Sequence, residues 1–257
     1  MSDRPAENQS RSLPWFARWW GILAIVFIII FILSAIYLVC QGLVFGKSVS
    51  ELTNQAQANL TAEEIFLGSP YSVETADDPA VGGTSSLVTI VEFCDWHSSY
   101  CQETAKTIRD IVSVYNGSVK LIFRDFVTDS DERVSRLAEA AQCANEQGKF
   151  WIMHDRLFLQ SELLNDEQIY KLAGDIGLDQ NNFKSCYESR RYQKEVQADT
   201  QAGLAAGIRG VPTFFFNGYK AEGALTAQNF VDIINYLLPG QELESDTVNT
   251  EINGEIN

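Results

Sequence analysis

The stretch that decides the fold is Leu87-Val88-Thr89-Ile90-Val91-Glu92-Phe93, followed directly by Cys94-Asp95-Trp96-His97-Ser98-Ser99-Tyr100-Cys101. Residues 87–93 are a β-rich apolar run with one acid inside it, which predicts a strand. Residues 98–115 are predicted to be helical, and Ser98 has a side chain that favours the N-cap position of a helix. One cysteine therefore lies at the end of a strand, and another, Cys101, lies in the first turn of a helix.

Outward from this turn, a second strand is predicted at residues 119–126, which completes a β-α-β unit. Residues 68–86 have the composition of turns and loops, and residues 131–207 are nearly all helical in pattern. Strand character returns at Thr213-Phe214-Phe215-Phe216, and Asn217-Gly218 after it is a strong hairpin signal. An amphipathic helix from about Ala227 to Leu238 follows. The expected fold class is α/β.

Between Asp77 and Leu238 the chain resembles the DsbA-like thiol-disulfide oxidoreductases, particularly the membrane-tethered thioredoxin-like proteins of prokaryotic envelopes. The resemblance is carried by short motifs in a fixed order: Asp78-Pro79, Val91-Glu92-Phe93 with the turn that follows, Gln142-Cys143-Ala144, Gln147-Gly148-Lys149-Phe150-Trp151, Cys186, and Gly207-Ile208-Arg209-Gly210-Val211-Pro212-Thr213-Phe214. It implies a thioredoxin-like fold with a helical insertion at about residues 130–207, and thiol-disulfide exchange as the activity.

The resemblance also implies roles for individual residues. Glu92 matches an acid buried beneath the inner cysteine, where burial raises the carboxyl pKa and allows the group to shuttle a proton. Val211-Pro212 matches a cis-proline turn that faces the redox turn and leaves the Val211 backbone free to pair with a bound peptide. Cys143 and Cys186 match a cysteine pair of the insertion, for which a structural disulfide is expected.

The chain departs from the family at Ser98, where relatives carry a cysteine. A serine cannot form the mixed disulfide with a substrate, so the usual cycle through positions 98 and 101 is excluded. Cys94 is the first possible replacement, because it lies on the same strand face as Glu92 and could bridge to Cys101 if their Cα atoms are within about 7 Å. The catalytic candidates are therefore Cys101, Cys94 and Glu92.

Two other interpretations stay open. In one, the domain keeps its peptide groove without a redox cycle and acts as a binding or chaperone-like module. In the other, Cys94, His97 and Cys101 bind copper or zinc, although their spacing matches no metal motif. No metal and no cofactor are expected.

A segment near the N-terminus has the character of a membrane helix. From Trp19 to Gly46 no residue is charged, and Ile22–Val39 is almost continuously apolar, which is long enough to cross a bilayer. The apolar region of a cleaved signal peptide would be shorter. Three arginines precede the segment and only Lys47 lies close behind it, so the N-terminus is expected in the cytoplasm and the remainder outside the cell membrane.

The expected order along the chain is a cytoplasmic tail (1–18), a transmembrane helix (19–44), a stalk or linker (45–76), the folded domain (77–240) and an acidic disordered tail (241–257). Behind the membrane segment lie 16 of the 19 basic and 32 of the 34 acidic residues, a net charge of about −16. Nucleic acid is therefore not an expected partner. Expected partners are extracytoplasmic proteins or peptides that contain cysteines, the membrane, and a membrane redox protein.

Overall fold

The computed structural model describes residues 65–66, 68–115, 117–128, 131–160 and 164–238, together with Leu23, residues 27–34 and Tyr37. The chain divides into two compact units, Met1–Gln55 and Ala56–Asn257. Within the first unit, residues 27–34 are helical. No helix among the described residues combines the length and the apolarity that crossing a membrane requires. Most of the predicted segment 19–44, and the predicted tails 1–18 and 241–257, lie outside the described residues.

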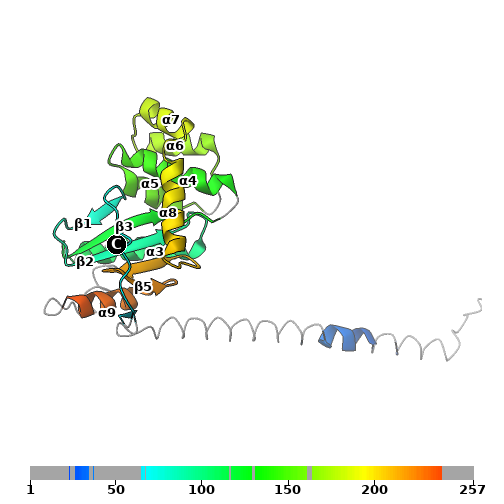
Figure 1. The fold of residues 1–257 in the computed structure, drawn as a ribbon. Helices are drawn as coiled ribbons and strands as arrows, with labels where there is room; N and C mark the ends of the chain where they lie inside the picture. Colours follow the sequence, from blue (N-terminus) through cyan, green and yellow to red (C-terminus); the bar gives the residue numbers. More distant parts are fainter. Residues whose placement is uncertain are drawn as a thin grey trace, which may run out of the picture. The chain divides into compact units, whose positions relative to one another are not determined.

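The second unit is built on a five-stranded sheet with the strand order β1-β3-β2-β4-β5 (Figure 1). Its strands are β1 (Ala80–Gly82), β2 (Val88–Cys94), β3 (Val119–Asp125), β4 (Thr213–Phe216) and β5 (Tyr219–Glu222). The two central strands β2 and β3 are parallel, and every other pair is antiparallel. The central strands β2, β3 and β4 are almost wholly buried, because helices cover both faces of the sheet.

Seven helices of this unit are described: α3 (Ser99–Val114), α4 (Glu132–Asn145), α5 (Phe150–Phe158), α6 (Asp166–Asp175), α7 (Gln180–Glu188), α8 (Gln193–Ala205) and α9 (Ala227–Leu237). Helices α3 and α9 pack against one face of the sheet, where Ile90, Phe214 and Phe230 share a core. The opposite face carries a second core with Phe93, Phe126 and Ile208, close to the end of α8. In Figure 1 the helices α4 to α7 form a block beyond the sheet edge.

This architecture confirms the predicted α/β thioredoxin-like fold with a helical insertion, which the structure places at α4 to α8. For the strands predicted at residues 87–93, 119–126 and 213–216 and the helices predicted at 98–115 and 227–238, each observed end lies within one residue of its predicted position.

One element was not predicted, since the predicted loop at residues 68–86 contains β1. Pro79, Gly82 and Gly83 give this short strand the composition of a loop. Gly82 has a φ of 104°, and a Cβ there would lie 2.3 Å from the carbonyl oxygen of Val119 on β3. Glycine is therefore required for the close approach of β1 to the sheet.

Candidate functional site

The turn between β2 and α3 is held by its own polar groups. Ser98 is the N-cap of α3, and its Oγ accepts a hydrogen bond of 3.3 Å from the backbone N–H of Cys101. Asp95 Oδ1 accepts one of 2.7 Å from the backbone N–H of His97. The serine that replaces the family cysteine therefore has a structural role, because it satisfies a free donor at the start of the helix.

Cys94 and Cys101 are joined by a disulfide across this turn. Their sulfurs are 2.12 Å apart and their Cα atoms 5.8 Å apart, inside the 7 Å limit for a bridge. Both residues are fully buried, with 0% of their surface exposed. The Cα–Cα distance thus permits the interpretation in which Cys94 replaces the thiol missing at position 98 and bridges to Cys101.

The metal interpretation lacks a ligand set. Within the described ranges, no group of three or more His, Cys, Asp or Glu side chains could hold a metal ion. His97 is exposed, whereas both sulfurs are buried and bonded to each other.

Glu92 lies on β2 beside the disulfide and is completely buried. Its Oε1 is 3.3 Å from the Sγ of Cys94, and its Oε2 has no hydrogen-bond partner among the described residues. Burial raises the pKa of this carboxyl to about 8, so it carries a proton at neutral pH. Because a disulfide sulfur holds no proton, Glu92 is the donor in this contact.

A second buried acid, Asp125, lies beside Cys94 on the neighbouring strand. The β2–β3 register pairs these two residues. The indole N–H of Trp96 donates to Asp125 Oδ1 at 2.7 Å, and the Gln142 amide donates to Oδ2 at 3.0 Å. Burial, followed by the charge of Asp199, raises the pKa of Asp125 to about 7. Sequence reasoning missed this residue. An acid at the carboxyl end of the strand that follows the redox turn could have indicated it, because the ends of neighbouring parallel strands lie side by side.

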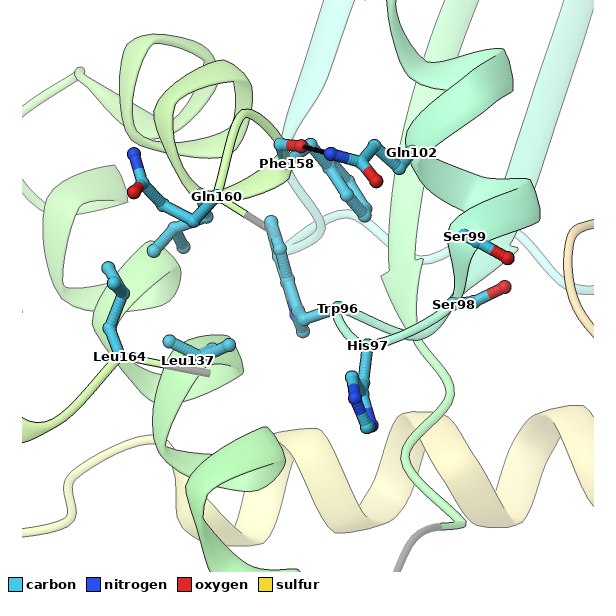
Figure 2. Close-up of a pocket in the computed structure, with 10 residues that line it drawn as sticks. Trp96, His97, Ser98, Ser99, Gln102, Leu137, Phe158, Gln160 and Leu164 are labelled. Atoms are coloured by element: carbon cyan, nitrogen blue, oxygen red, sulfur yellow. Dashed lines mark hydrogen bonds between the residues drawn. The ribbon is translucent and has the colours of Figure 1, made fainter. Parts of the chain in front are cut away.

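A pocket of about 260 Å³ opens beside the turn (Figure 2). It is lined by Trp96, His97, Ser98, Ser99, Gln102, Leu137, Leu157, Phe158, Gln160 and Leu164. The Trp96 ring stacks on Phe158, with centroids 4.8 Å apart, and the Gln102 amide donates to the Phe158 carbonyl oxygen. One wall therefore comes from the turn itself, and the others come from α3 and the helical insertion.

The peptide bond between Val211 and Pro212 is cis. Pro212 directly precedes β4, whose Thr213 pairs with Phe93 of β2. In this antiparallel register the next residue of β2, Cys94, lies opposite Pro212. Pro212 is therefore close to the end of β2 that carries the disulfide. Binding of a peptide along Val211 stays a prediction.

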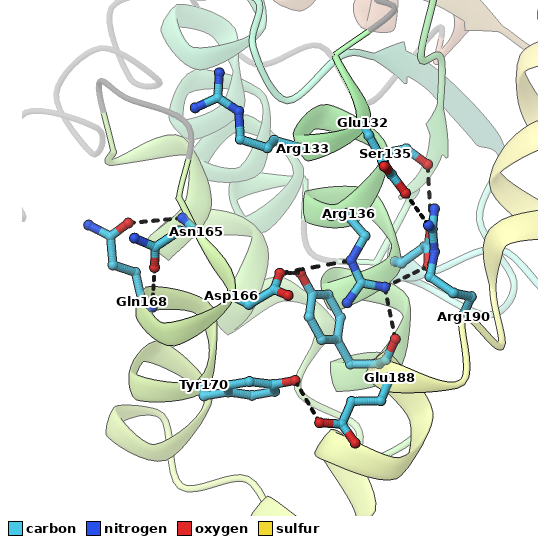
Figure 3. Close-up of polar contacts among 12 residues, drawn as sticks. Glu132, Arg133, Ser135, Arg136, Asn165, Asp166, Gln168, Tyr170, Glu188 and Arg190 are labelled. Carbon is cyan, nitrogen blue, oxygen red and sulfur yellow. Dashed lines mark hydrogen bonds and ion pairs between the residues drawn. The ribbon is translucent and has the colours of Figure 1, made fainter.

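The second disulfide, Cys143–Cys186, joins α4 to α7 with a Cα–Cα distance of 5.8 Å. Arg136 on α4 also donates to the Tyr187 carbonyl oxygen on α7 at 2.9 Å. Arg190, just after the end of α7, pairs with Glu132 of α4 (Figure 3) and with the buried Glu139 of the same helix. The Cys143–Cys186 disulfide therefore cross-links the insertion and takes no part in the turn between β2 and α3.

The fold and the site together define a thioredoxin-fold protein with a disulfide at its redox turn. The chain belongs to the thioredoxin family, whose family model matches residues 74–236.

Several solved structures share this fold. A thioredoxin-like oxidoreductase from Silicibacter pomeroyi is 24% identical with a TM-score of 0.55, over 63% of this chain and 92% of that one. The thiol-disulfide exchange protein alpha-DsbA2 from Wolbachia pipientis is 19% identical with a TM-score of 0.57, over 64% and 89%. Oxidised BdbD from Bacillus subtilis is 20% identical with a TM-score of 0.51, over 73% and 97%.

Curated relatives include proteins named as Na(+)/H(+) antiporters. That of Salinispora tropica is 31% identical over 170 residues, which are 66% of this chain and 26% of the antiporter. That of Herminiimonas arsenicoxydans is 24% identical over 75% of this chain and 34% of the antiporter. The chain thus spans about a quarter to a third of the length of these relatives.

Proposed function

We propose that this protein carries out thiol-disulfide exchange on cysteine-containing envelope or secreted proteins, with Cys94 and Cys101 in place of the usual pair at positions 98 and 101. The observation that carries the proposal is the disulfide between these two residues at the redox turn, with the Glu92 carboxyl 3.3 Å from one of its sulfurs. A buried proton donor beside one sulfur makes the two sulfurs chemically unequal.

In the proposed reaction, a thiolate of the partner protein attacks the Sγ of Cys101. The bond between the two sulfurs breaks, and Cys94 leaves with the electron pair as a thiolate. Glu92 gives its proton to this thiolate, which removes the charge from a buried position. A mixed disulfide between Cys101 and the partner remains.

A second thiolate of the partner then attacks the partner's own sulfur in the mixed disulfide and releases Cys101. The partner has gained a disulfide, and Cys94 and Cys101 have gained two electrons. The same steps in reverse would reduce a partner. Cys101 is thus the sulfur that bonds to the partner, and Cys94 is the resolving thiol.

The proposed location is the outer face of the cell membrane, with a helix at residues 19–44 as the tether and the N-terminus in the cytoplasm. The uncharged run from Trp19 to Gly46 and the three arginines before it support this arrangement. A membrane redox protein would restore the disulfide after each cycle. Release of the chain from membranes by alkaline carbonate would contradict the tether, and protection from protease outside intact spheroplasts would contradict the orientation.

The redox proposal is tested by titration of the full chain in glutathione buffers, followed by alkylation and mass mapping of each cysteine. We expect the Cys94–Cys101 pair to titrate above about −300 mV and to reform after reduction, as exchangeable disulfides do. The Cys143–Cys186 pair is the internal control and is expected below about −300 mV, in the range of structural disulfides. A Cys94–Cys101 pair with the same low potential would overturn the proposal.

The roles of the two sulfurs are tested with single variants and glutathione disulfide as the probe. Reduced Cys94→Ser protein is expected to accumulate a stable mixed disulfide with glutathione, because Cys101 has lost its resolving thiol. Reduced Cys101→Ser protein is expected to form none at an appreciable rate. The opposite pattern would exchange the two roles.

The complete burial of both sulfurs supports a second candidate, a redox-inactive peptide-binding or chaperone-like module. In that case the disulfide would be structural, and the pocket beside Trp96 would receive a side chain of the bound segment. A low potential for both disulfides, together with saturable binding of unfolded cysteine-free peptides, would favour this function over exchange.

A further inference from the structure

The disulfide closes a loop, residues 94–101, and Trp96 is the buried aromatic side chain of that loop. His97, Ser99 and Tyr100 of the same loop are exposed, whereas Trp96 is buried. Trp96 shares one apolar cluster with Cys94 and Cys101. Because both sulfurs are buried, a partner thiolate needs a local opening to reach them, and lifting this loop would remove Trp96 from its place.

Two kinds of contact hold Trp96. Its ring stacks on Phe158, packs edge-to-face with Phe150 and His154, and lies tilted against Phe123. Its only polar atom, the indole N–H, donates to Asp125 at 2.7 Å. Asp125 is in turn fixed by Gln142 on α4 and by its place in the central strand β3. The acid is therefore a rigid acceptor.

We propose that Asp125 is a positioning residue that, through Trp96, holds the disulfide-closed loop against the core and so controls how readily a thiolate reaches Cys101. This inference rests on the proposed exchange function. It assigns the acid a role distinct from that of Glu92, whose carboxyl contacts a sulfur directly.

Gln142 allows the charge of Asp125 to be removed with little change of shape. Its Oε1 is buried and has no hydrogen-bond partner among the described residues. In an Asp125→Asn variant, the new amide can donate to this oxygen after the Gln142 amide rotates, while the asparagine oxygen still accepts from Trp96. The variant therefore keeps both contacts and loses the charge that strengthens them.

The expected result is faster reduction of the Cys94–Cys101 disulfide by dithiothreitol in the full chain, read by mass mapping of these two cysteines. A hydrogen bond to a charged acceptor is stronger than one to a neutral acceptor by about a factor of ten in equilibrium terms. We therefore expect Asp125→Asn protein to be reduced about tenfold faster than the wild type at pH 8.

The ratio of the two rates should fall toward one at pH 6, because burial raises the pKa of Asp125 to about 7 and the wild-type carboxyl is then neutral as well. The thiolate fraction of the reductant cancels in the ratio. Both proteins also carry the other charged or titratable groups around Asp125: Asp78, Glu92, Arg124, His154 and Asp199. A merely structural effect would leave the ratio independent of pH.

Trp96→Phe keeps the aromatic ring and removes the N–H donor, so it should also accelerate reduction. Trp151→Phe is the matched control, because Trp151 donates its indole N–H to the Ala80 carbonyl oxygen at 3.1 Å but lies on α5, outside the loop. If Trp96→Phe and Trp151→Phe proteins are reduced at equal rates, the inference is wrong, even where Asp125→Asn protein does not fold. The glutathione titration of the wild type decides the exchange function separately.

Discussion

Replacing Glu92 by glutamine tests the central electrostatic feature of the site. Glu92 is fully buried on β2, and burial raises its pKa from the ordinary value of 4.5 to about 8. Between these two values the folded protein holds a proton that the unfolded chain releases. The wild-type protein must therefore lose stability as the pH rises from about 4.5 toward 8, whereas a neutral glutamine contributes no such loss.

The size of the effect follows from the two pKa values. Each pH unit within this interval costs about 1.4 kcal/mol, so the stability difference between Glu92→Gln and wild type should grow by about 3 to 4 kcal/mol from pH 5 to pH 8. Asp125, Asp199 and Glu195 also have raised pKa values. Their contributions occur in both proteins and cancel in the difference.

The assay is urea unfolding of the oxidised full chain at pH 5, 6, 7 and 8, with linear extrapolation of the free energy. Glu139→Gln is the matched control, since Glu139 is equally buried but accepts hydrogen bonds from Arg136 and Arg190. At pH 8 this control should lose stability because Arg136 and Arg190 lose the negative charge of their buried partner, whereas Glu92→Gln should gain stability. A Glu92→Gln difference that stays flat from pH 5 to pH 8 would refute the reasoning.

Two further predictions concern stability away from the turn. The pair of substitutions Cys143→Ala and Cys186→Ala should lower the free energy of unfolding by about 4 kcal/mol, because the bond closes a loop of 43 residues; an unchanged urea midpoint would contradict this. Gly203→Ala should cost about 1–3 kcal/mol, since its Cβ would lie 2.6 Å from an aromatic carbon of Phe126. Gly174→Ala, with nothing nearer than 3.5 Å, should instead gain up to about 1 kcal/mol. If both substitutions change the free energy of unfolding in the same direction, the space around the new Cβ does not decide the outcome.

Most of the fold could be predicted from the sequence because its elements have local signals. The apolar strand before Cys94 and the Asn217-Gly218 hairpin each determine their structure within a few residues. The strand β1 had no such signal. Its three residues become a strand only by pairing with β3, and two glycines permit that approach.

The candidate site was predicted in part. Glu92 and Cys101 were named because the family resemblance places a buried acid and the inner cysteine of the redox turn at these positions. Cys94 was named because strand alternation places it on the same face as Glu92. Asp125 and Trp96 were not named, because their contact joins residues from two strands and an intervening turn. No local pattern shows that an indole folds back onto the end of the next strand.

The sequence by itself determined the α/β order of elements and the absence of a thiol at position 98, since both depend on residue identity and local pattern. Only the tertiary structure decided that Cys101 bonds to Cys94 and that two acids, Glu92 and Asp125, lie beside that disulfide. The physical reason is the parallel pairing of β2 with β3, which brings the ends of two distant strands together in a dry interior and gives these carboxyls their raised pKa values.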